Sequence, residues 1–360
     1  MRIVYGVVTT GMGHLSRLLA LLPLFESDGH ELLLLISGPG EIPAFVSRAI
    51  GQVRVERYAG LEMVEDGRGG ISKRETLKSV TARLPGFFDE LRRAHKSVTA
   101  FAPNLIVSDF DPITGSPFVS PAVPKIGIGN QPAQKLPAAE QVPGHALQRW
   151  KVDVVCKLFT SGLDHELGCH FYPIDAGCLP PILRPEILAA TPENHGHIVV
   201  YHSFARFFEP VRDFAIRHPD VPIFAYGYAT PPRGTPENIV FESDDMRFVD
   251  DLVTCDAFVG TAGFQSISEA IYLGKKVAIQ PIERHYEQLW NAAQVERHGL
   301  GRRIRGSLDD ALDQSVDPDL REGLATWYRE GARLAYERLL SFAPDGARSR
   351  PDRAVLTAVR

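Results

Sequence analysis

The sequence predicts an α/β protein made of two Rossmann-like, doubly wound domains that face each other across a cleft. The chain has 360 residues, and at roughly 150 residues per domain this length suggests two domains. Segments typical of buried strands alternate with segments typical of helices, which implies parallel sheets covered by helices on both faces. The alternation stops at the Pro180-Pro181 pair and Pro185 and then starts again, and this composition is typical of a linker.

The N-terminal series begins with a strand at Ile3 to Val8, then the Gly11-Met12-Gly13-His14 turn and an apolar helix. Further strands are expected at residues 31–36, 105–108 and 125–128, and a mobile surface loop at the polar, glycine-containing residues 64–81. The C-terminal series predicts strands at residues 197–201, 222–226, 239–241, 257–259 and 276–280, and helices at 204–217 and 264–273, with another ending near Cys255. We therefore predict domains at residues 1–179 and 193–360 with a linker at 180–192, the last helix being able to pack back on the N-terminal domain.

Composition narrows the class of protein. The hydrophobic fraction of 44% and the charged fraction of 23% are those of a globular protein. A net charge of -5 gives no electrostatic reason to expect nucleic acid or an anionic membrane as partner. The start of the chain has no leader pattern, and no segment reaches the roughly 18 consecutive apolar residues of a spanning helix. Four cysteines are too few for a disulfide framework, so we expect a soluble, cytoplasmic protein. A peripheral membrane contact and the oligomeric state stay open.

The most informative segment follows the strand that ends at Val259. Small residues from Gly260 to Gly263 form a turn, and a helix opens near Phe264. The unpaired N–H groups of such a helix start bind anions, and a diphosphate is the obvious one. Glu269, about one turn into the helix, is placed to accept hydrogen bonds from a ribose. The alternative is an ordinary strand-to-helix turn with a surface glutamate.

Further motif residues make a resemblance specific. They are Gly260-Thr261-Ala262-Gly263-Phe264-Gln265-Ser266, Glu269-Ala270, Leu273-Gly274-Lys275, Gln280-Pro281, His285-Tyr286-Glu287-Gln288 and Asn291-Ala292. Together they resemble the UDP-glycosyltransferase superfamily of GT-B fold. Its bacterial branch includes the enzyme that adds N-acetylglucosamine to the peptidoglycan lipid precursor. The plant branch has a histidine in this turn that the present sequence lacks, so Thr261 and backbone amides would have to suffice.

The resemblance assigns roles to residues of the C-terminal half. The diphosphate would contact Thr261, Ala262, Gly263, Phe264 and Gln265, with Ser203 as a further phosphate contact after the first strand of this domain. Glu269 would bind the ribose, and Glu287 with Gln288 the sugar hydroxyls. The base would lie beside the loop that leads to Phe248. No cofactor is implied, because the nucleotide-sugar is a substrate.

The N-terminal half carries a second candidate site at Gly11, Gly13 and His14. As a dinucleotide fingerprint this is incomplete, since Ser16 stands where the third glycine belongs. In the resembled family a Gly-x-Gly-His turn faces the acceptor, and its histidine is the candidate base, here His14. The alternative is a histidine that only caps its helix. Arg17 would contact a phosphate or an acceptor carboxylate, or lie on a solvated face, and Asn130 is expected at the cleft.

Two aspartates follow another strand end, Asp109 and Asp111. Their spacing invites a metal site, which we reject, because a GT-B enzyme stabilises the leaving diphosphate with a helix dipole and amides. In the resembled family an aspartate here orients the catalytic histidine. Both aspartates are candidates, and we favour Asp111. His165, Cys169, His170 and Cys178 match no paired zinc-ligand spacing, so no metal is predicted.

These residues predict an inverting, metal-independent glycosyltransferase of the hexosyltransferase type. Its partners would be a nucleotide-sugar donor, with UDP favoured by resemblance, and an unidentified acceptor hydroxyl. Retaining GT-B enzymes carry a glutamate eight residues before the ribose glutamate, where this chain has Thr261. The alternatives are a nucleotide-sugar epimerase or hydrolase on the same fold, and a catalytically silent sugar-nucleotide-binding protein.

Overall fold

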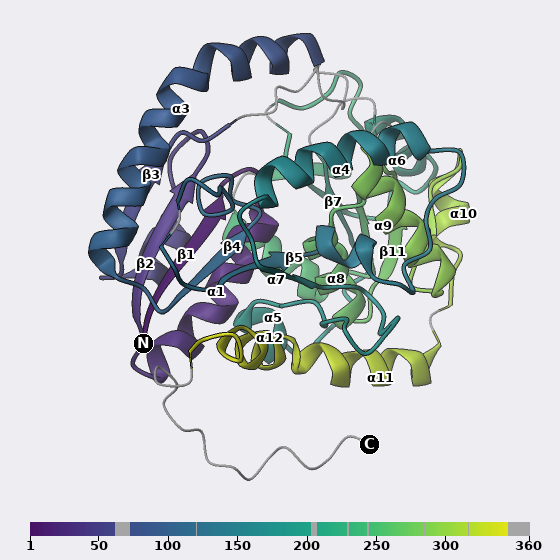
Figure 1. Cartoon of the computed structure of the whole chain (residues 1–360). Coiled ribbons are helices and arrows are strands. Elements are labelled where there is room, and N and C mark those ends of the chain that lie inside the picture. The colour runs from purple at the N-terminus through teal and green to yellow at the C-terminus, as the bar shows by residue number, and fades with distance from the viewer. Residues whose placement is uncertain are drawn as a thin grey trace.

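Two parallel, six-stranded sheets form the frame of the protein. The computed structural model describes residues 1–61, 73–119, 121–202, 207–228, 230–242, 245–283, 285–315 and 317–344. The strand orders are β3-β2-β1-β4-β5-β6 and β12-β11-β10-β7-β8-β9, so each sheet turns back on its first strand in the doubly wound manner. Figure 1 shows the two sheets side by side, each flanked by helices. The predicted two-domain α/β architecture is confirmed, while the exact domain limits stay a prediction.

The first sheet comes from the N-terminal half. Its strands are β1 Arg2–Val8, β2 Glu31–Ser37, β3 Arg54–Tyr58, β4 Leu105–Asp109, β5 Lys125–Gly129 and β6 His165–Gly168. The helices are α1 Met12–Ser27, α2 Ala44–Ile50, α3 Lys73–Phe101 and α4 Ala146–Thr160, with a short 3-10 helix η1 Gln131–Lys135. In β1, β2, β4 and β5 nearly every position is buried, because helices cover both faces of the sheet.

The loop predicted at residues 64–81 is wrong over its second part. Helix α3 already begins at Lys73, and residues 64–72 lie outside the described residues. The first turns of α3 are polar in sequence and so lack the helical pattern of apolar residues. That pattern appears only further along, where Leu91, Ala94 and Val98 recur every three or four residues and pack on the sheet.

The second sheet comes from the C-terminal half. Its strands are β7 Ile198–Tyr201, β8 Ile223–Tyr226, β9 Ile239–Glu242, β10 Ala257–Gly260, β11 Lys276–Ile279 and β12 Arg302–Arg303. The helices are α5 Pro185–Ala189, α6 Phe208–Arg217, α7 Asp245–Thr254, α8 Phe264–Tyr272, α9 Tyr286–Arg297, α10 Leu308–Leu312, α11 Pro318–Arg329 and α12 Gly331–Leu340. The short helix α5 lies inside the segment predicted as a linker, and the short edge strand β12 was not predicted.

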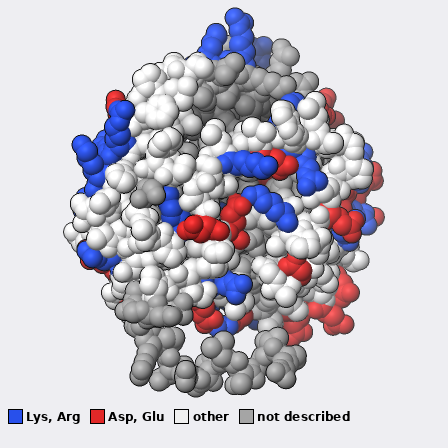
Figure 2. Space-filling view, viewed as in Figure 1, with Lys and Arg blue, Asp and Glu red and all other residues white. Residues whose placement is uncertain are grey.

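The two halves contact each other in several places. Helix α12 returns to α1, where the Tyr336 ring lies 5.3 Å from that of Phe25 and its hydroxyl contacts Asp28. On α9, Trp290 donates its indole N–H to the backbone oxygen of Glu140 at 3.0 Å. One apolar core also joins residues of both sheets. In the view of Figure 2, acidic side chains gather at the right and lower right, on the side of α6, α10 and α11.

Within the described residues, no helix is long and apolar enough to cross a membrane.

Candidate functional site

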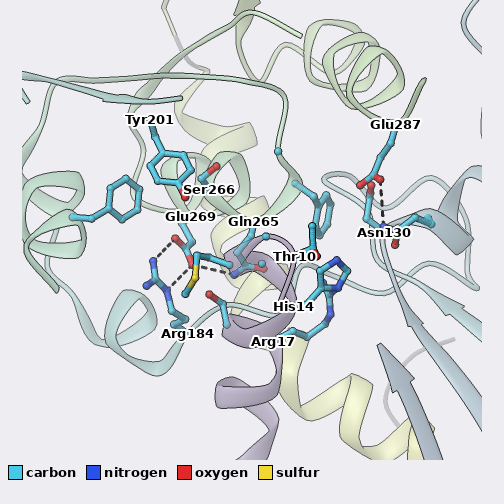
Figure 3. A pocket seen from close by; sticks show the side chains of 18 of the residues that line it. Thr10, His14, Arg17, Asn130, Arg184, Tyr201, Gln265, Ser266, Glu269 and Glu287 are labelled. Carbon is cyan, nitrogen blue, oxygen red and sulfur yellow. Dashed lines mark hydrogen bonds and ion pairs between the residues drawn. The ribbon is translucent and has the colours of Figure 1, made fainter. Parts of the chain in front are cut away.

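A cavity of about 260 Å³ lies between the two halves. It forms where the carboxyl ends of β1 and β10 approach each other, the usual position of ligands in doubly wound folds. Figure 3 shows His14 and Arg17 on one side of it and Glu269 and Arg184 on another. Most of the predicted site residues line the cavity: Gly11, Gly13, His14, Arg17, Asn130, Phe248, Gly263, Phe264, Gln265, Glu269 and Glu287.

Glycines shape the N-terminal edge of the cavity. Gly11 precedes α1 with φ 87°, a left-handed conformation that favours glycine. A Cβ atom on Gly13 would lie 3.1 Å from the Cβ of Gln265, so the starts of α1 and α8 nearly touch. The two glycines therefore serve different needs, one a backbone conformation and the other a close approach between the halves.

His14 is held by Asp109 at this edge. Its Nδ1 lies 2.6 Å from Oδ1 of Asp109, which leaves Nε2 as the ring nitrogen free of this contact. Arg17 donates to both carboxylate oxygens of Asp109, at 2.6 and 2.8 Å, and the Tyr5 hydroxyl donates to it at 3.2 Å. Burial alone would raise the pKa of Asp109, but Arg17 and His14 outweigh burial and lower that pKa. The carboxylate stays charged and can orient the imidazole as a base.

The favoured choice of Asp111 as the partner of His14 is wrong, since Asp109 makes that contact. Asp111 is fully buried, and its Oδ2 accepts from the backbone N–H and the hydroxyl of Thr114, both at 2.8 Å. Phe110 between the two aspartates has φ 54° and turns the chain, so Asp111 closes the turn after β4 instead.

Of the two alternatives for Arg17, the solvated face is wrong, although the residue does line the cavity. It is 3% exposed rather than on a solvated face, and its guanidinium is engaged by Asp109. Asn130, as expected, lies at the cavity, where its amide donates to the backbone oxygen of Cys169 at 3.2 Å.

The start of α8 forms the opposite edge. Its N-cap Gly263 provides no side-chain cap, and the first N–H groups of a helix have no acceptor within the helix. Gly263, Phe264, Gln265 and Ser266 all line the cavity, which makes this edge suited to an anion.

Thr261 and Ala262 do not line the cavity. The backbone oxygen of Ala262 accepts from the amide of Asn291 at 2.9 Å, and that of Thr261 from the N–H of Gly263 at 2.8 Å. The turn faces the body of the domain at Thr261 and Ala262, and it reaches the cavity from its last residue, Gly263, onward.

Glu269 is bound by an arginine that the sequence analysis missed. Arg184 donates to the two oxygens of Glu269, at 2.9 and 2.7 Å, and Gln265 donates to it at 3.0 Å. Glu269 is 1% exposed, so this buried carboxylate has a charged partner. The side-chain amide oxygen of Gln265, also buried at the cavity, has no hydrogen-bond partner within the described part of the chain.

The start of α9 forms a third edge of the cavity and carries Glu287. The Glu287 carboxylate accepts a hydrogen bond from the side-chain amide of Gln131 at 3.3 Å, across the two halves. Gln288 does not line the cavity, because its side-chain oxygen accepts from the backbone N–H of Ile282 at 3.0 Å. An aromatic wall stands apart from these residues, with the rings of Tyr201 and Phe248 5.2 Å apart. Ser203 lies outside the described residues.

No group of three or more His, Cys, Asp or Glu side chains is arranged to hold a metal ion in the described ranges of the chain. His170, one of the residues considered for zinc, instead contacts the backbone of Tyr172, and the Cys178 thiol contacts backbone oxygens.

Comparison with known proteins places the chain in a family. The sequence profile of glycosyl transferase family 1 matches residues 1–316, which is most of the chain, so the chain belongs to this family. No curated protein matches its sequence.

Solved structures share its fold at low identity. The kitacinnamycin glycotransferase has a TM-score of 0.62 at 16% identity, and the alignment covers 95% of this chain and 99% of that one. The calicheamicin glycosyltransferase CalG4 has a TM-score of 0.59 at 17% identity, covering 95% and 98%. UGT2 of Phytolacca americana, complexed with UDP-2fluoro-glucose and pterostilbene, has a TM-score of 0.56 at 13% identity, covering 94% of each chain. Together with the family match, these neighbours identify a glycosyltransferase of GT-B fold.

Proposed function

We propose that this protein is an inverting glycosyltransferase that moves a sugar from a nucleotide-sugar, preferably a UDP-sugar, onto an acceptor hydroxyl. One observation carries the proposal. The pair of His14 and Asp109 stands at one edge of the cavity, while the start of α8 and the buried Glu269 stand at the other. A base and an anion site thus face one space, as a displacement at an anomeric carbon requires.

Three parts of the nucleotide-sugar donor would be bound by different residues. The diphosphate would lie on the N–H groups that open α8, and Glu269 would accept from the ribose hydroxyls. Glu287 would accept from sugar hydroxyls, and the wall of Tyr201 and Phe248 would flank the base. We infer uridine from the family resemblance, and the UDP-sugar bound to the Phytolacca enzyme supports that choice.

The chemical step needs only this chain's own groups. Nε2 of His14 takes the proton of the acceptor hydroxyl, and the oxygen attacks the anomeric carbon. The bond from that carbon to the diphosphate oxygen breaks, and its electron pair leaves with the nucleoside diphosphate toward α8. Asp109 stays ionised and stabilises the imidazolium. A single displacement inverts the anomeric centre, and Thr261 occupies the place of the glutamate that retaining enzymes carry. We propose that neither a metal nor a cofactor takes part and that the protein works in the cytoplasm.

Calorimetry with a panel of nucleoside diphosphates and their sugars tests the donor site. We expect UDP to bind more tightly than GDP, ADP or dTDP, also in the presence of EDTA. Glu269→Gln should weaken UDP binding by about tenfold or more, because a hydrogen bond to a charged group contributes roughly 1.5–3 kcal/mol. Glu322→Gln, an exposed substitution on α11, is the control. If none of the nucleotides binds, the proposal fails.

Turnover with an identified acceptor separates transfer from hydrolysis. His14→Ala should abolish transfer while UDP still binds, and the product of the unaltered protein should have the opposite anomeric configuration by NMR. Release of free sugar that does not depend on an acceptor would identify a hydrolase instead.

A further inference from the structure

Two buried side-chain oxygens at the cavity lack a hydrogen-bond donor. Among the described residues that line it, the buried side-chain polar atoms without a partner are Oε1 of Gln265 and Oδ1 of Asn130. The two residues are 8% and 2% exposed. Both atoms are amide oxygens, which only accept hydrogen bonds. A buried acceptor without a donor destabilises a fold, so these positions call for a donor from outside the chain.

The neighbours of Gln265 fix the orientation of its side-chain amide. Nε2 has two hydrogens, and it donates to the backbone oxygen of Ile182 at 3.2 Å and to Oε1 of Glu269 at 3.0 Å. Both partners are acceptors, so exchanging the nitrogen and the oxygen of the amide would set oxygen against oxygen. The side chain therefore has no N–H left for a phosphate. A phosphate contact at Gln265 would have to come from its backbone N–H in the first turn of α8.

The carboxylate of Glu269 has little capacity left for a ligand. Its Oε1 accepts from Nε of Arg184 and from Gln265, and its Oε2 accepts from Nη2 of Arg184. A carboxylate has about four acceptor positions, two on each oxygen, so in this arrangement one remains, on Oε2. A ribose presents two neighbouring hydroxyl groups. Glu269 can accept from one of them while its ion pair with Arg184 stays intact, and the other hydroxyl needs a different acceptor.

Gln265 supplies such an acceptor on the same face of α8. It lies one helical turn before Glu269, and the hydrogen bond between the two side chains keeps them together. Figure 3 shows Gln265 beside Glu269, whereas Asn130 lies on the side of Glu287. A ligand group at Glu269 is therefore next to Gln265 and across the cavity from Asn130.

We propose that Oε1 of Gln265 accepts a hydrogen bond from one ribose hydroxyl of the donor nucleotide, while Glu269 accepts from the other. The inference rests on the proposed function, which puts the ribose at Glu269, and it adds the residue that shares this ribose. The donor is then a ribonucleotide rather than a deoxyribonucleotide. A deoxyribose lacks one of the two hydroxyls, so a buried acceptor on Gln265 or on Glu269 would stay unpaired in the complex.

Calorimetry with UDP, 2′-deoxy-UDP and 3′-deoxy-UDP tests the proposal. We expect each deoxy form to bind the unaltered protein roughly fivefold or more weakly than UDP, since each lacks a hydroxyl from which the site accepts. Gln265→Met has a side chain of similar length that is only a weak acceptor. In this variant one of the two deoxy forms should bind within about twofold of UDP. The other form should keep its penalty, because the hydroxyl that it lacks is the one bound by Glu269.

This comparison separates a direct contact from structural damage. Gln265→Met also removes the N–H groups donated to Ile182 and Glu269, which lowers the affinity for all three nucleotides together. Only the loss of a direct contact removes the difference between UDP and one deoxy form. Asn130→Leu is the matched control, since it removes the other unpartnered oxygen at the same cavity, and it should keep both penalties. Melting temperatures show that each variant is folded.

The outcomes distinguish this inference from the proposed function. If the unaltered protein binds UDP and Glu269→Gln weakens that binding, the proposed donor site stands. The inference is then overturned by equal binding of UDP and both deoxy forms to the unaltered protein, or by unchanged penalties in Gln265→Met. It is also overturned if Asn130→Leu removes the same penalty as Gln265→Met. If GDP or ADP binds in place of UDP, its own deoxy forms serve in the same comparison, and if no nucleotide binds, the proposed function fails together with the inference.

Discussion

Asp109 is the residue on which the N-terminal edge of the site depends. It is fully buried and accepts from His14, Arg17 and Tyr5 at once. Asp109→Asn keeps the size but removes the charge that orients the imidazole and stabilises its protonated form. We expect kcat to fall by roughly 10²–10⁴-fold, as in related base–carboxylate pairs, with the affinity for UDP unchanged.

Asp111→Asn is the control for that variant. The Asp111 carboxylate accepts from Thr114 within its own turn rather than from His14, so its loss should lower the melting temperature and leave kcat of the folded protein nearly unaltered. Equal losses of kcat in the two variants would contradict the assignment to Asp109.

Arg184 has an equally specific task at the donor edge, where it pairs with the buried Glu269. Arg184→Gln leaves that carboxylate without its charged partner. Breaking a buried ion pair from one side costs about 3–5 kcal/mol, and we expect a loss of unfolding free energy at the lower end of this range. Urea denaturation measures it.

The double variant Arg184→Gln, Glu269→Gln isolates the pair, because it removes both charges together. It should regain much of the stability lost in Arg184→Gln alone. If the losses of the two single variants simply add, the ion pair contributes nothing to stability beyond its separate parts.

At the scale of elements, the starts of α1 and α8 are the parts that must fit together. Gly13→Ala would place a methyl group 3.1 Å from the Cβ of Gln265, whose side chain is held by Ile182 and Glu269. Because the contact is to the start of α8 rather than to a flexible tip, we expect the two helices to move apart. UDP affinity should fall in calorimetry, with a smaller effect on stability.

Gly11→Ala provides the complementary case. No atom lies within 4 Å of a Cβ at Gly11, but its φ of 87° strains any other residue. We expect a loss of about 1–2 kcal/mol in unfolding free energy from backbone strain. A larger effect of Gly13→Ala than of Gly11→Ala on stability would contradict this distinction.

At the scale of the whole molecule, acid should weaken the contact between the halves. His170 is fully buried, its ring centroid lies 5.1 Å from that of Trp290 on α9, and burial lowers its pKa to about 4. The unfolded value is about 6.5, so the contribution to stability is complete above that pH and is lost as pH falls toward 4. Between these two pKa values, one such histidine lowers the free energy of unfolding by up to about 1.4 kcal/mol for each unit by which the pH falls.

Urea denaturation between pH 7 and pH 4.5 checks this dependence. His170→Gln cannot titrate, so its unfolding free energy should fall less steeply with pH, even if it is lower at neutral pH. Burial lowers the pKa of His202 to about 4 as well. The unfolding free energy of His170→Gln should therefore still fall with pH, although less steeply than that of the unaltered protein.

Features that depend on short segments, such as helix starts, could be predicted from the sequence, whereas contacts between distant residues could not. The turn before Phe264 and the turn at Gly11 are local patterns, and the structure has a helix starting after each. The pairing of Arg184 with Glu269 joins positions 85 residues apart, and nothing in either neighbourhood indicates it. Asp109 and Asp111 could not be told apart from the sequence. They have different partners because Phe110 between them has a positive φ, and a phenylalanine in the sequence does not indicate that conformation.

The path of the chain also fixes how the cavity can open. The chain crosses from one half to the other near Pro181 and crosses back where α12 begins, and these crossings lie against each other, since a Cβ on Gly331 would meet the backbone oxygen of Pro181 at 2.1 Å. We expect two adjacent crossings to act as a single hinge, about which the halves swing rather than slide apart. The swing is smallest at this hinge and grows with distance from it. We therefore expect substrate entry to break the more remote links, such as the 3.3 Å hydrogen bond from Gln131 to Glu287, before it disturbs the hinge itself.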